Sequence, residues 1–379
     1  MIILNLIYTI LIFIFGLLIA YKTKKTIKSN IIYFVLIEHM IFSYFYYLFT
    51  LYNISDARGY FIRATYNNNW LATFNVGTDF IDFVATIPIK YLNFSYLNAH
   101  LLFGLFGFIG FTYFIKMLKN NGKNLFGIPL TIIIVLLPGF HFWTSALGKD
   151  SLFFMALMMF IYSLRYVKQN KIKLLFSFFL IIMIRPHMAM VIILATLLTL
   201  IIVNPKKINL SHIFLLTISI IVFILFIPLF NKFVGIDELS TESIQQKIEI
   251  FNNEGKRGGG LTSNIDVSGY SLPAKLFAYL FRPFFFDARS VFQYIASFEN
   301  LFLLLIIIQS TINKYKHKKI HNKQYINKFL LYYILLSWLM LSINMYNLGL
   351  ASRQKYMIIP AIFLLLFDNP TKQFIKKKL

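Results

Sequence analysis

Runs of apolar residues long enough to cross a lipid bilayer recur along the whole chain, with short polar connections between them. A segment inside a bilayer must satisfy its own backbone hydrogen bonds, so such runs fold as helices. Only 13% of the residues are charged, against 58% that are hydrophobic, which excludes an ordinary soluble domain. The pattern predicts a single all-α transmembrane domain over residues 1–379 with about eleven spans, at 2–21, 31–53, 96–118, 125–143, 151–166, 174–184, 188–203, 212–231, the last part of 277–312, 329–346 and 356–367.

The lysines and arginines gather in alternate connections between these runs. With the N-terminus outside, the inside connections hold 23 of the 37 basic residues, as the positive-inside rule requires. We therefore predict an outer N-terminus, a cytoplasmic C-terminus and two longer outer loops, 54–95 and 232–276. In the second loop Ile244, Ile248 and Phe251 recur at helical spacing, which predicts a short amphipathic helix.

The net charge of +23 does not indicate a nucleic-acid partner, because topology explains where the charge lies. The most basic run, NKYKHKKIHNK at 313–323, falls in a predicted cytoplasmic connection beside anionic headgroups. The chain has no cysteine and no visible metal-ligand spacing, so the sequence predicts neither a metal site nor a cofactor.

Several charged residues lie on the predicted outer side, where membrane insertion does not call for them. The span before Arg185 has only about 11 apolar residues, or roughly 16 Å of helix against a hydrocarbon core of about 30 Å. Charges at such depth must face protein or a water-filled cavity. The sequence therefore predicts a polar, net-positive cavity where the outer ends of several spans meet, lined by Lys149 and Asp150, Arg185 and His187, Arg282, and Arg353.

A positive cavity open to the outer leaflet favours an anionic lipid such as a polyprenyl pyrophosphate. Arginine binds phosphate through two parallel hydrogen bonds and stays charged, so the candidate pyrophosphate ligands are Lys149, Arg185, Arg282 and Arg353. Asp56 and Asp150 are candidate general bases, with His187 as a competing one. Asp150 also has two simpler interpretations, as a cap of the following helix or as the partner of Lys149.

The segments that carry these residues resemble the bacterial Wzy-type O-antigen and capsule repeat-unit polymerases, and more distantly the GT-C glycosyltransferases. The resemblance implies that Arg185, Arg282 and Arg353 hold the lipid-linked pyrophosphate, and that Asp56 matches the acidic residue of the first outer loop in GT-C enzymes. Ala57 stands where that loop often has a second acid. The segments are SDARGY (55–60), HFWTSALGKDS (141–151), IRPHM (184–188), YLFRPFFFDARS (279–290) and NLGLASRQKYMIIP (347–360).

The resemblance implies a metal-independent, multi-pass glycosyltransferase of the bacterial inner membrane. Such an enzyme polymerises undecaprenyl-pyrophosphate-linked oligosaccharides at the outer face, with the bilayer, this lipid-linked substrate and a chain-length regulator or other polysaccharide-assembly proteins as partners. Two alternatives stay open. A GT-C enzyme would use a polyprenyl-phosphate sugar donor, and a flippase for the same lipid would show internal symmetry, which the chain does not clearly have.

Overall fold

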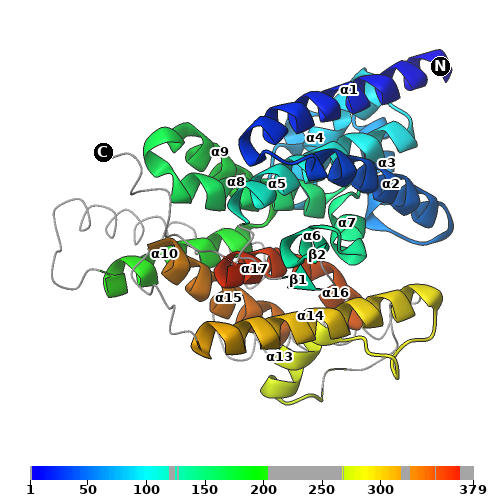
Figure 1. The fold of residues 1–379 in the computed structure, drawn as a ribbon. Helices are drawn as coiled ribbons and strands as arrows, with labels where there is room; N and C mark the ends of the chain where they lie inside the picture. The colour runs from blue at the N-terminus through cyan, green and yellow to red at the C-terminus, as the bar shows by residue number, and fades with distance from the viewer. Residues whose placement is uncertain are drawn as a thin grey trace, which may run out of the picture.

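The computed structural model describes residues 2–118, 124–125, 128–203, 267, 269–316, 325–345 and 347–367. Within these ranges the regular structure is helical apart from a hairpin of two short strands, β1 (Asn124–Leu125) and β2 (Ile128–Pro129). The all-α prediction therefore holds for the described residues. The helices (Figure 1) are α1 (Ile2–Ile27), α2 (Ile31–Tyr52), α3 (Asp56–Tyr66), η1 (Leu71–Thr73), α4 (Thr78–Thr86), η2 (Ile87–Tyr91), α5 (Tyr96–Met117), α6 (Leu130–Val135), α7 (Pro138–Thr144), α8 (Lys149–Arg165), η3 (Val167–Gln169), α9 (Lys171–Ile184), α10 (Pro186–Val203), α13 (Leu272–Phe281), α14 (Val291–Lys316), α15 (Tyr325–Ile343), α16 (Leu348–Gln354), η4 (Lys355–Met357) and α17 (Ile359–Phe367).

Helix α5 is the most enclosed of the long helices, and it packs against α1, α2 and α8. Three glycines on α5 allow this close packing: Gly104, Gly107 and Gly110. A Cβ added at Gly107 would lie 2.1 Å from the carbonyl oxygen of Thr144, and one at Gly110 would lie 2.6 Å from the ring of Phe154. Small residues let membrane helices come close enough for their backbones to meet. The glycines thereby bring α7 and α8, which carry the segment 141–151, against the centre of the bundle.

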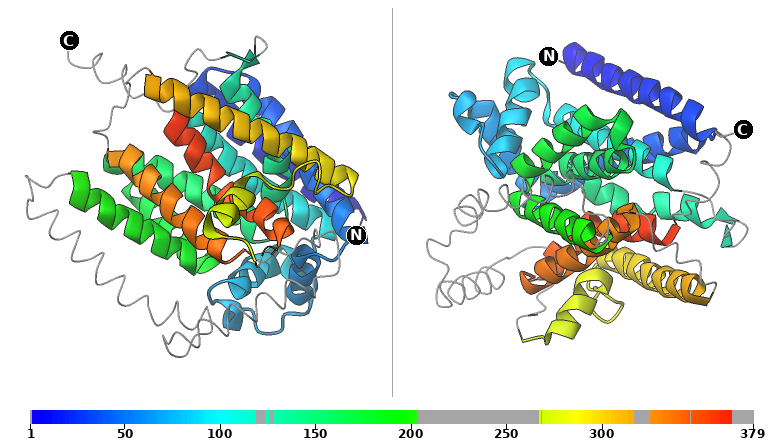
Figure 2. Two further views of the ribbon diagram at one scale, coloured as in Figure 1. Left: turned by 90° about the horizontal axis from the view of Figure 1, so that it is seen from below. Right: turned by 90° about the vertical axis from the view of Figure 1, so that its left-hand side faces the viewer.

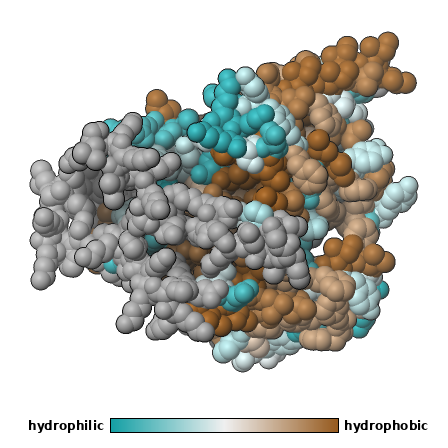
Figure 3. Space-filling model, in the orientation of Figure 1, coloured by the Kyte–Doolittle hydropathy of each residue, from teal (hydrophilic) through white to brown (hydrophobic). Residues whose placement is uncertain are grey.

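Five described helices are long and apolar enough to cross a membrane: α1, α2, α5, α14 and α15. A sixth span results if α16 and η4 are counted with α17, to which they are joined at a bend of 43°. Helix α1 lies at one side of the bundle and α14 at the other, and α1 turns a mostly apolar surface outward (Figures 2 and 3). The chain is therefore a membrane protein, while the count of eleven spans and the orientation stay predictions.

Two predicted spans are interrupted, and a third segment is a span only in its last part, as predicted. The segment 125–143 contains a hairpin followed by α6 and α7, which are separated at Leu136 and Leu137. The segment 277–312 contains the end of α13, a non-helical stretch and then α14, so only its last part is a span, as predicted. The segment 356–367 is bent between η4 and α17. Pro129, Pro138 and Pro360 lie at or beside these helix starts, where proline is tolerated because its missing N–H is not needed.

The first predicted outer loop is mostly helical. Residues 54–95 form α3, η1, α4 and the π-helical turn η2, and α3 and α4 pack against each other. Hydrogen bonds from side chains to the backbone stabilise the connections between these helices. For example, the indole nitrogen of Trp70 donates to the carbonyl of Phe83 at 2.9 Å. Most of the second loop, 232–276, with the predicted helix around Ile244 and Phe251, and the predicted span 212–231 lie outside the described residues.

Candidate functional site

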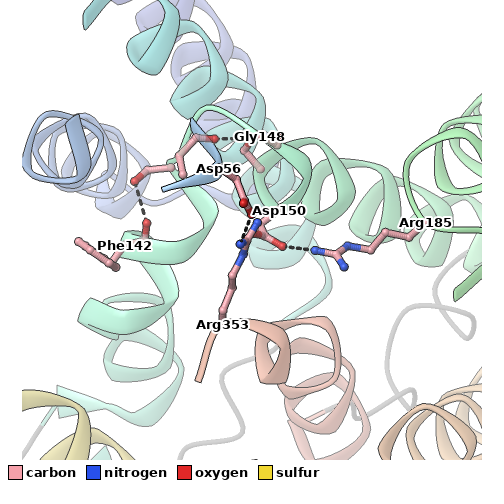
Figure 4. A network of polar contacts seen from close by, with 9 residues as sticks. Asp56, Phe142, Gly148, Asp150, Arg185 and Arg353 are labelled. Carbon is pink, nitrogen blue, oxygen red and sulfur yellow. Dashed lines mark hydrogen bonds and ion pairs between the residues drawn. The ribbon is translucent and has the colours of Figure 1, made fainter. Parts of the chain in front are cut away.

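Four charged side chains from distant parts of the chain meet in one network (Figure 4). The two carboxylate oxygens of Asp150 accept from two arginines: Arg185 Nη2 donates to Oδ1 at 2.5 Å, and Arg353 Nε donates to Oδ2. Arg353 Nη1 also donates to Asp56 Oδ2 at 2.6 Å. The sequence predicts that these residues meet at the outer ends of their segments, and the structure brings all four together.

Local structure explains why the side chains point to one place. Asp56 and Asp150 lie in the first turns of α3 and α8, where unpaired backbone N–H groups favour an acid. Gly148, at φ +151, makes the sharp turn into α8. Arg185 stands at the break between α9 and α10 because Pro186 prevents one continuous helix. Arg353 lies in the last turn of α16.

The network is buried at one end and open at the other. The side chains of Arg185 and Asp150 are 8% and 11% exposed, and that of Asp56 is 62% exposed. Burial alone would raise the pKa of the Asp150 carboxyl, but the charges and hydrogen bonds of Arg353 and Arg185 hold its pKa below the ordinary value. Asp150 is therefore ionised, and it binds both arginines as a carboxylate.

The network has more positive charge and more donors than it uses. Lys149, Arg185 and Arg353 supply three cations against the carboxylates of Asp56 and Asp150, which leaves one positive charge in excess. Among the described residues, Lys149 makes no ion pair, and Arg185 Nε is buried without a hydrogen-bond partner. Burial, followed by the nearby guanidinium groups, lowers the pKa of Lys149 to about 8. Such an arrangement attracts an anion.

In the part of the chain that the structure describes, the pocket beside Asp150 and Arg353 is small. The space there measures about 10 Å³, which is enough for about one water molecule. The reason is that the arginines are held by carboxylates of the chain itself and that aromatic rings pack around them. A diphosphate group could bind here only if these side chains moved apart. The lining residues are Trp143, Thr144, Asp150, Phe153, Phe154, Arg353, Tyr356 and Met357.

His187, the third candidate base, lies in the first turn of α10, two residues after Arg185. Burial, and then the positive charges of Arg185 and Lys149, lower its pKa to about 3. A histidine with so low a pKa is neutral at pH 7 and accepts a proton poorly. The structure therefore gives no support to His187 as the general base.

Arg282 lies outside the network, contrary to the sequence prediction. Its guanidinium pairs with Asp287 and donates from Nη1 to the hydroxyl of Tyr270 at 2.6 Å. Asp287 also accepts from the backbone N–H of Phe284 at 2.9 Å. The pair thus closes the turn after α13, and no ion pair among the described residues joins it to Asp150.

Helix α3 adds residues that the sequence reasoning missed. Tyr60 lies against Gly148, and the guanidinium of Arg63 lies 5.0 Å from the centre of the Tyr60 ring. Arg63 Nε donates to Asp82 Oδ2 of α4 at 2.7 Å. Asp56, Tyr60 and Arg63 stand four and then three residues apart, which is the spacing of one helix face and could have indicated them. Asp82 has no such signal in the sequence.

No group of three or more histidines and acids is placed to hold a metal ion in the part of the chain that the structure describes. The predicted metal independence stays a prediction. Comparisons with protein-family models, with curated proteins and with solved structures find no match for this chain. The polymerase resemblance therefore stays a prediction as well, and the geometry must support any functional proposal.

Proposed function

We propose that this protein is a membrane glycosyl-transfer enzyme that joins oligosaccharide units carried on a polyprenyl pyrophosphate at the outer face of the bacterial inner membrane. The acceptor hydroxyl attacks the anomeric carbon of the donor sugar. The bond from that carbon to the pyrophosphate oxygen breaks, and the polyprenyl pyrophosphate leaves with the negative charge. The reaction needs no cofactor, and a chain-length regulator or other assembly protein is the expected protein partner.

One observation carries the proposal: a buried guanidinium network with unused donors and excess positive charge. Burial makes charge–charge interactions stronger than they are in water, so arginines preorganised there stabilise a leaving phosphate well. Arg353 and Arg185 each present several N–H groups that suit phosphate oxygens. In the proposal they exchange Asp150 for the pyrophosphate when the substrate enters.

A groove near the network suits the lipid part of such a substrate. It lies between the α6–α7 break and α14 and has a volume of about 510 Å³. Its wall includes Glu299, which accepts from the hydroxyl of Tyr356, three residues after Arg353 in the chain. In the proposal an amphiphile with its head at Arg353 places its tail in this groove. The groove is lined by Ile132, Ile133, Leu136, Leu137, Pro138, Ile295, Phe298, Glu299 and Phe302.

Asp56 is the better placed of the two predicted acidic bases. Both oxygens of Asp150 are taken by arginines, and its side chain is 11% exposed. Asp56 is 62% exposed and uses only Oδ2 for Arg353. In the proposal Asp56 takes the proton of the acceptor hydroxyl, and Asp150 positions the arginines before the substrate enters.

Replacement of single arginines in a strain that makes a long surface polysaccharide tests the proposal. Arg185→Ala and Arg353→Ala should leave the strain with exported single repeat units and no long chains. Arg289→Ala is the matched control, because Arg289 is an exposed arginine of the predicted outer side. Long chains in both network variants would contradict the proposal. Loss of export as well would favour the flippase, and release of a polyprenyl monophosphate by the purified protein would favour a GT-C enzyme.

A further inference from the structure

The first outer loop carries an apolar surface that no other part of the described structure covers. Leu71 is 71% exposed and Phe74 is 52% exposed, and the end of η2 adds two more exposed side chains. A large exposed apolar surface marks a contact with a partner or with a membrane. We refer to this surface as the apolar layer, and it consists of Trp70, Leu71, Phe74, Tyr91 and Leu92.

Ring contacts hold the apolar layer in a fixed position against α4. The indole of Trp70 stacks on Phe83 of α4, with the ring centres 4.7 Å apart, and it meets Tyr91 edge-on at 6.2 Å. Phe74 lies 5.0 Å from Phe83 between ring centres. The indole nitrogen of Trp70 also donates to the carbonyl of Phe83 at 2.9 Å. The exposed side chains therefore form a surface of the fold and do not belong to a loose segment.

One edge of the apolar layer joins the exposed face of α9. Phe80 of α4 contacts the rings of both Phe74 and Phe83, and it packs edge-on against Phe179 of α9 at 6.4 Å. Phe179 lies about 8 Å before the end of α9, so α4 lies alongside α9 and not beyond its end. Beyond this contact α9 continues the apolar surface with exposed residues on one helix face: Ile172, Leu175, Phe176 and Phe179.

The other edge of the apolar layer reaches α1. Phe94, the second residue after Leu92, packs against Tyr8 of α1 with the ring centres 4.3 Å apart. The side chain of Asn5, near the start of α1, accepts from the N–H of Ser95 at 3.1 Å. Helix α1 is long and apolar enough to cross a membrane, and most of its apolar side chains are exposed. The apolar layer is therefore level with the end of a membrane-spanning helix, at the end of the bundle where α3 and α4 lie (Figure 2).

A bilayer interface suits this surface, because it continues two apolar surfaces of a membrane protein and contains a tryptophan and a tyrosine. These two residue types are enriched where acyl chains meet headgroups. Beside the layer, Lys90 donates to the carbonyl of Asn67 and to the side chain of Asn68, and a lysine at this height favours anionic headgroups. We propose that the apolar layer inserts between the headgroups of the leaflet at this end of the bundle and anchors the first outer loop there.

The anchor has a consequence for the arginine network. Helix α4 packs against α3, and Asp56 lies in the first turn of α3. Anchoring of the loop therefore holds Asp56, the exposed member of the network, close to the headgroups. The inference does not depend on the proposed function, because it concerns only the contact between the loop and lipid.

Spin labels on single cysteines test the contact. The chain has no cysteine, so Leu71→Cys, Phe74→Cys and Leu92→Cys each provide one labelling site. The labelled proteins are reconstituted in vesicles of phosphatidylethanolamine and phosphatidylglycerol. The measured quantities are the collision rates of each label with oxygen, which concentrates among acyl chains, and with a water-soluble nickel chelate. Arg58→Cys is the matched control, because Arg58 is an exposed residue of the same loop and a charged side chain is costly among acyl chains.

Labels in the apolar layer should collide freely with oxygen. Their collision rate with the nickel chelate should be about 10-fold or more lower than that of the Arg58→Cys label, because a polar solute enters the acyl region poorly. Phe176→Cys on the exposed face of α9 should show the same protection. The sites at Leu71 and Leu92 lie on different turns of the chain, so the test stays open if one substitution disturbs the fold.

Free access of the nickel chelate to the labels at both Leu71 and Leu92 would overturn the anchor, because the loop would then face water. Protection of both labels from oxygen as well as from the chelate would also overturn it. In that case protein covers the layer, and line broadening between labels would identify a second copy of the chain. Protection from the chelate together with free access of oxygen at both sites would support the anchor.

Discussion

Arg353 and Arg282 carry the same sequence signal but have different surroundings. Each lies near the predicted outer end of an apolar segment. Arg353 binds Asp56 and Asp150, which are 297 and 203 residues away in the chain, whereas Arg282 binds Asp287, five residues away. A local pair can close a turn on its own. A pair made between distant helices fixes their relative positions, so it can also respond to a ligand that enters between them.

Removal of each arginine should show this difference in stability. Arg353→Ala removes one of the two partners of the buried Asp150, and with it the ion pairs that join α16 to α3 and α8. The free energy of unfolding should therefore fall by about 3–5 kcal/mol. Arg282→Ala leaves Asp287 with the N–H of Phe284, and the fall should be about 1–3 kcal/mol. Equilibrium unfolding in mixed micelles measures both. Equal losses in the free energy of unfolding would mean that the pairing of distant helices stabilises the fold no more than the local pair does.

Neutralisation of each acid should sharpen the comparison. Asp150→Asn leaves Arg185 without its carboxylate partner and Arg353 with Asp56 alone, so added sulfate should raise the thermal midpoint of this variant more than that of the wild type. Asp287→Asn frees only Arg282, which keeps its bond to Tyr270, so its response to sulfate should be smaller. A larger response in Asp287→Asn would place the anion site at the turn instead.

The smallest expected effect is the pH dependence that Lys149 causes. Its pKa is about 8 in the folded protein and near the ordinary 10.5 in the unfolded chain. Below pH 8 both states hold the proton, and the cost of burying the charge is fully present. Between pH 8 and 10.5 the unfolded state binds more protons, so this residue makes stability rise with pH.

The stabilisation by sulfate should change in the opposite direction, because Lys149 loses its charge as the pH passes about 8. Thermal midpoints with and without sulfate from pH 7 to 9 measure the effect, since sulfate keeps its charge over that range. Lys149→Arg is the control that stays charged throughout. A decline in Lys149→Arg as steep as in the wild type would assign the titration to another group.

The sequence predicts the membrane fold and much of the candidate site. Hydropathy identifies the long helices, and the short apolar run before Arg185 correctly indicates that this residue is buried. Placing charges on one side of the membrane brings Asp56, Asp150 and Arg353 to the same end of the bundle. The length of an apolar run can be predicted because local composition determines it, while the side of the membrane on which each charge lies stays a prediction.

The remaining features depend on packing that the sequence does not encode locally. The break between α6 and α7 is stabilised by Glu299, whose carboxylate accepts from the N–H of Gly139 at 2.7 Å across 160 residues. Glu38 also lies near a distant residue, because its Oε2 is 3.5 Å from His141 Nε2, but this oxygen makes no hydrogen bond among the described residues. The ion pair of Asp82 with Arg63 forms only because α3 and α4 pack together. Each of these contacts follows from the angle between helices, which no single segment specifies.

Reconstitution of the purified protein in liposomes with the lipid-linked repeat unit tests the central claim most directly. The measured quantity is the polyprenyl pyrophosphate released as the sugar chain grows. Arg353→Lys keeps the charge but loses the planar guanidinium that donates to Asp150 and Asp56 from two separate nitrogens, and it should lower the rate by about 100-fold or more. Arg282→Lys should keep a rate within about 3-fold of the wild type. Similar rates in the two variants, or no release by the wild type, would contradict the account.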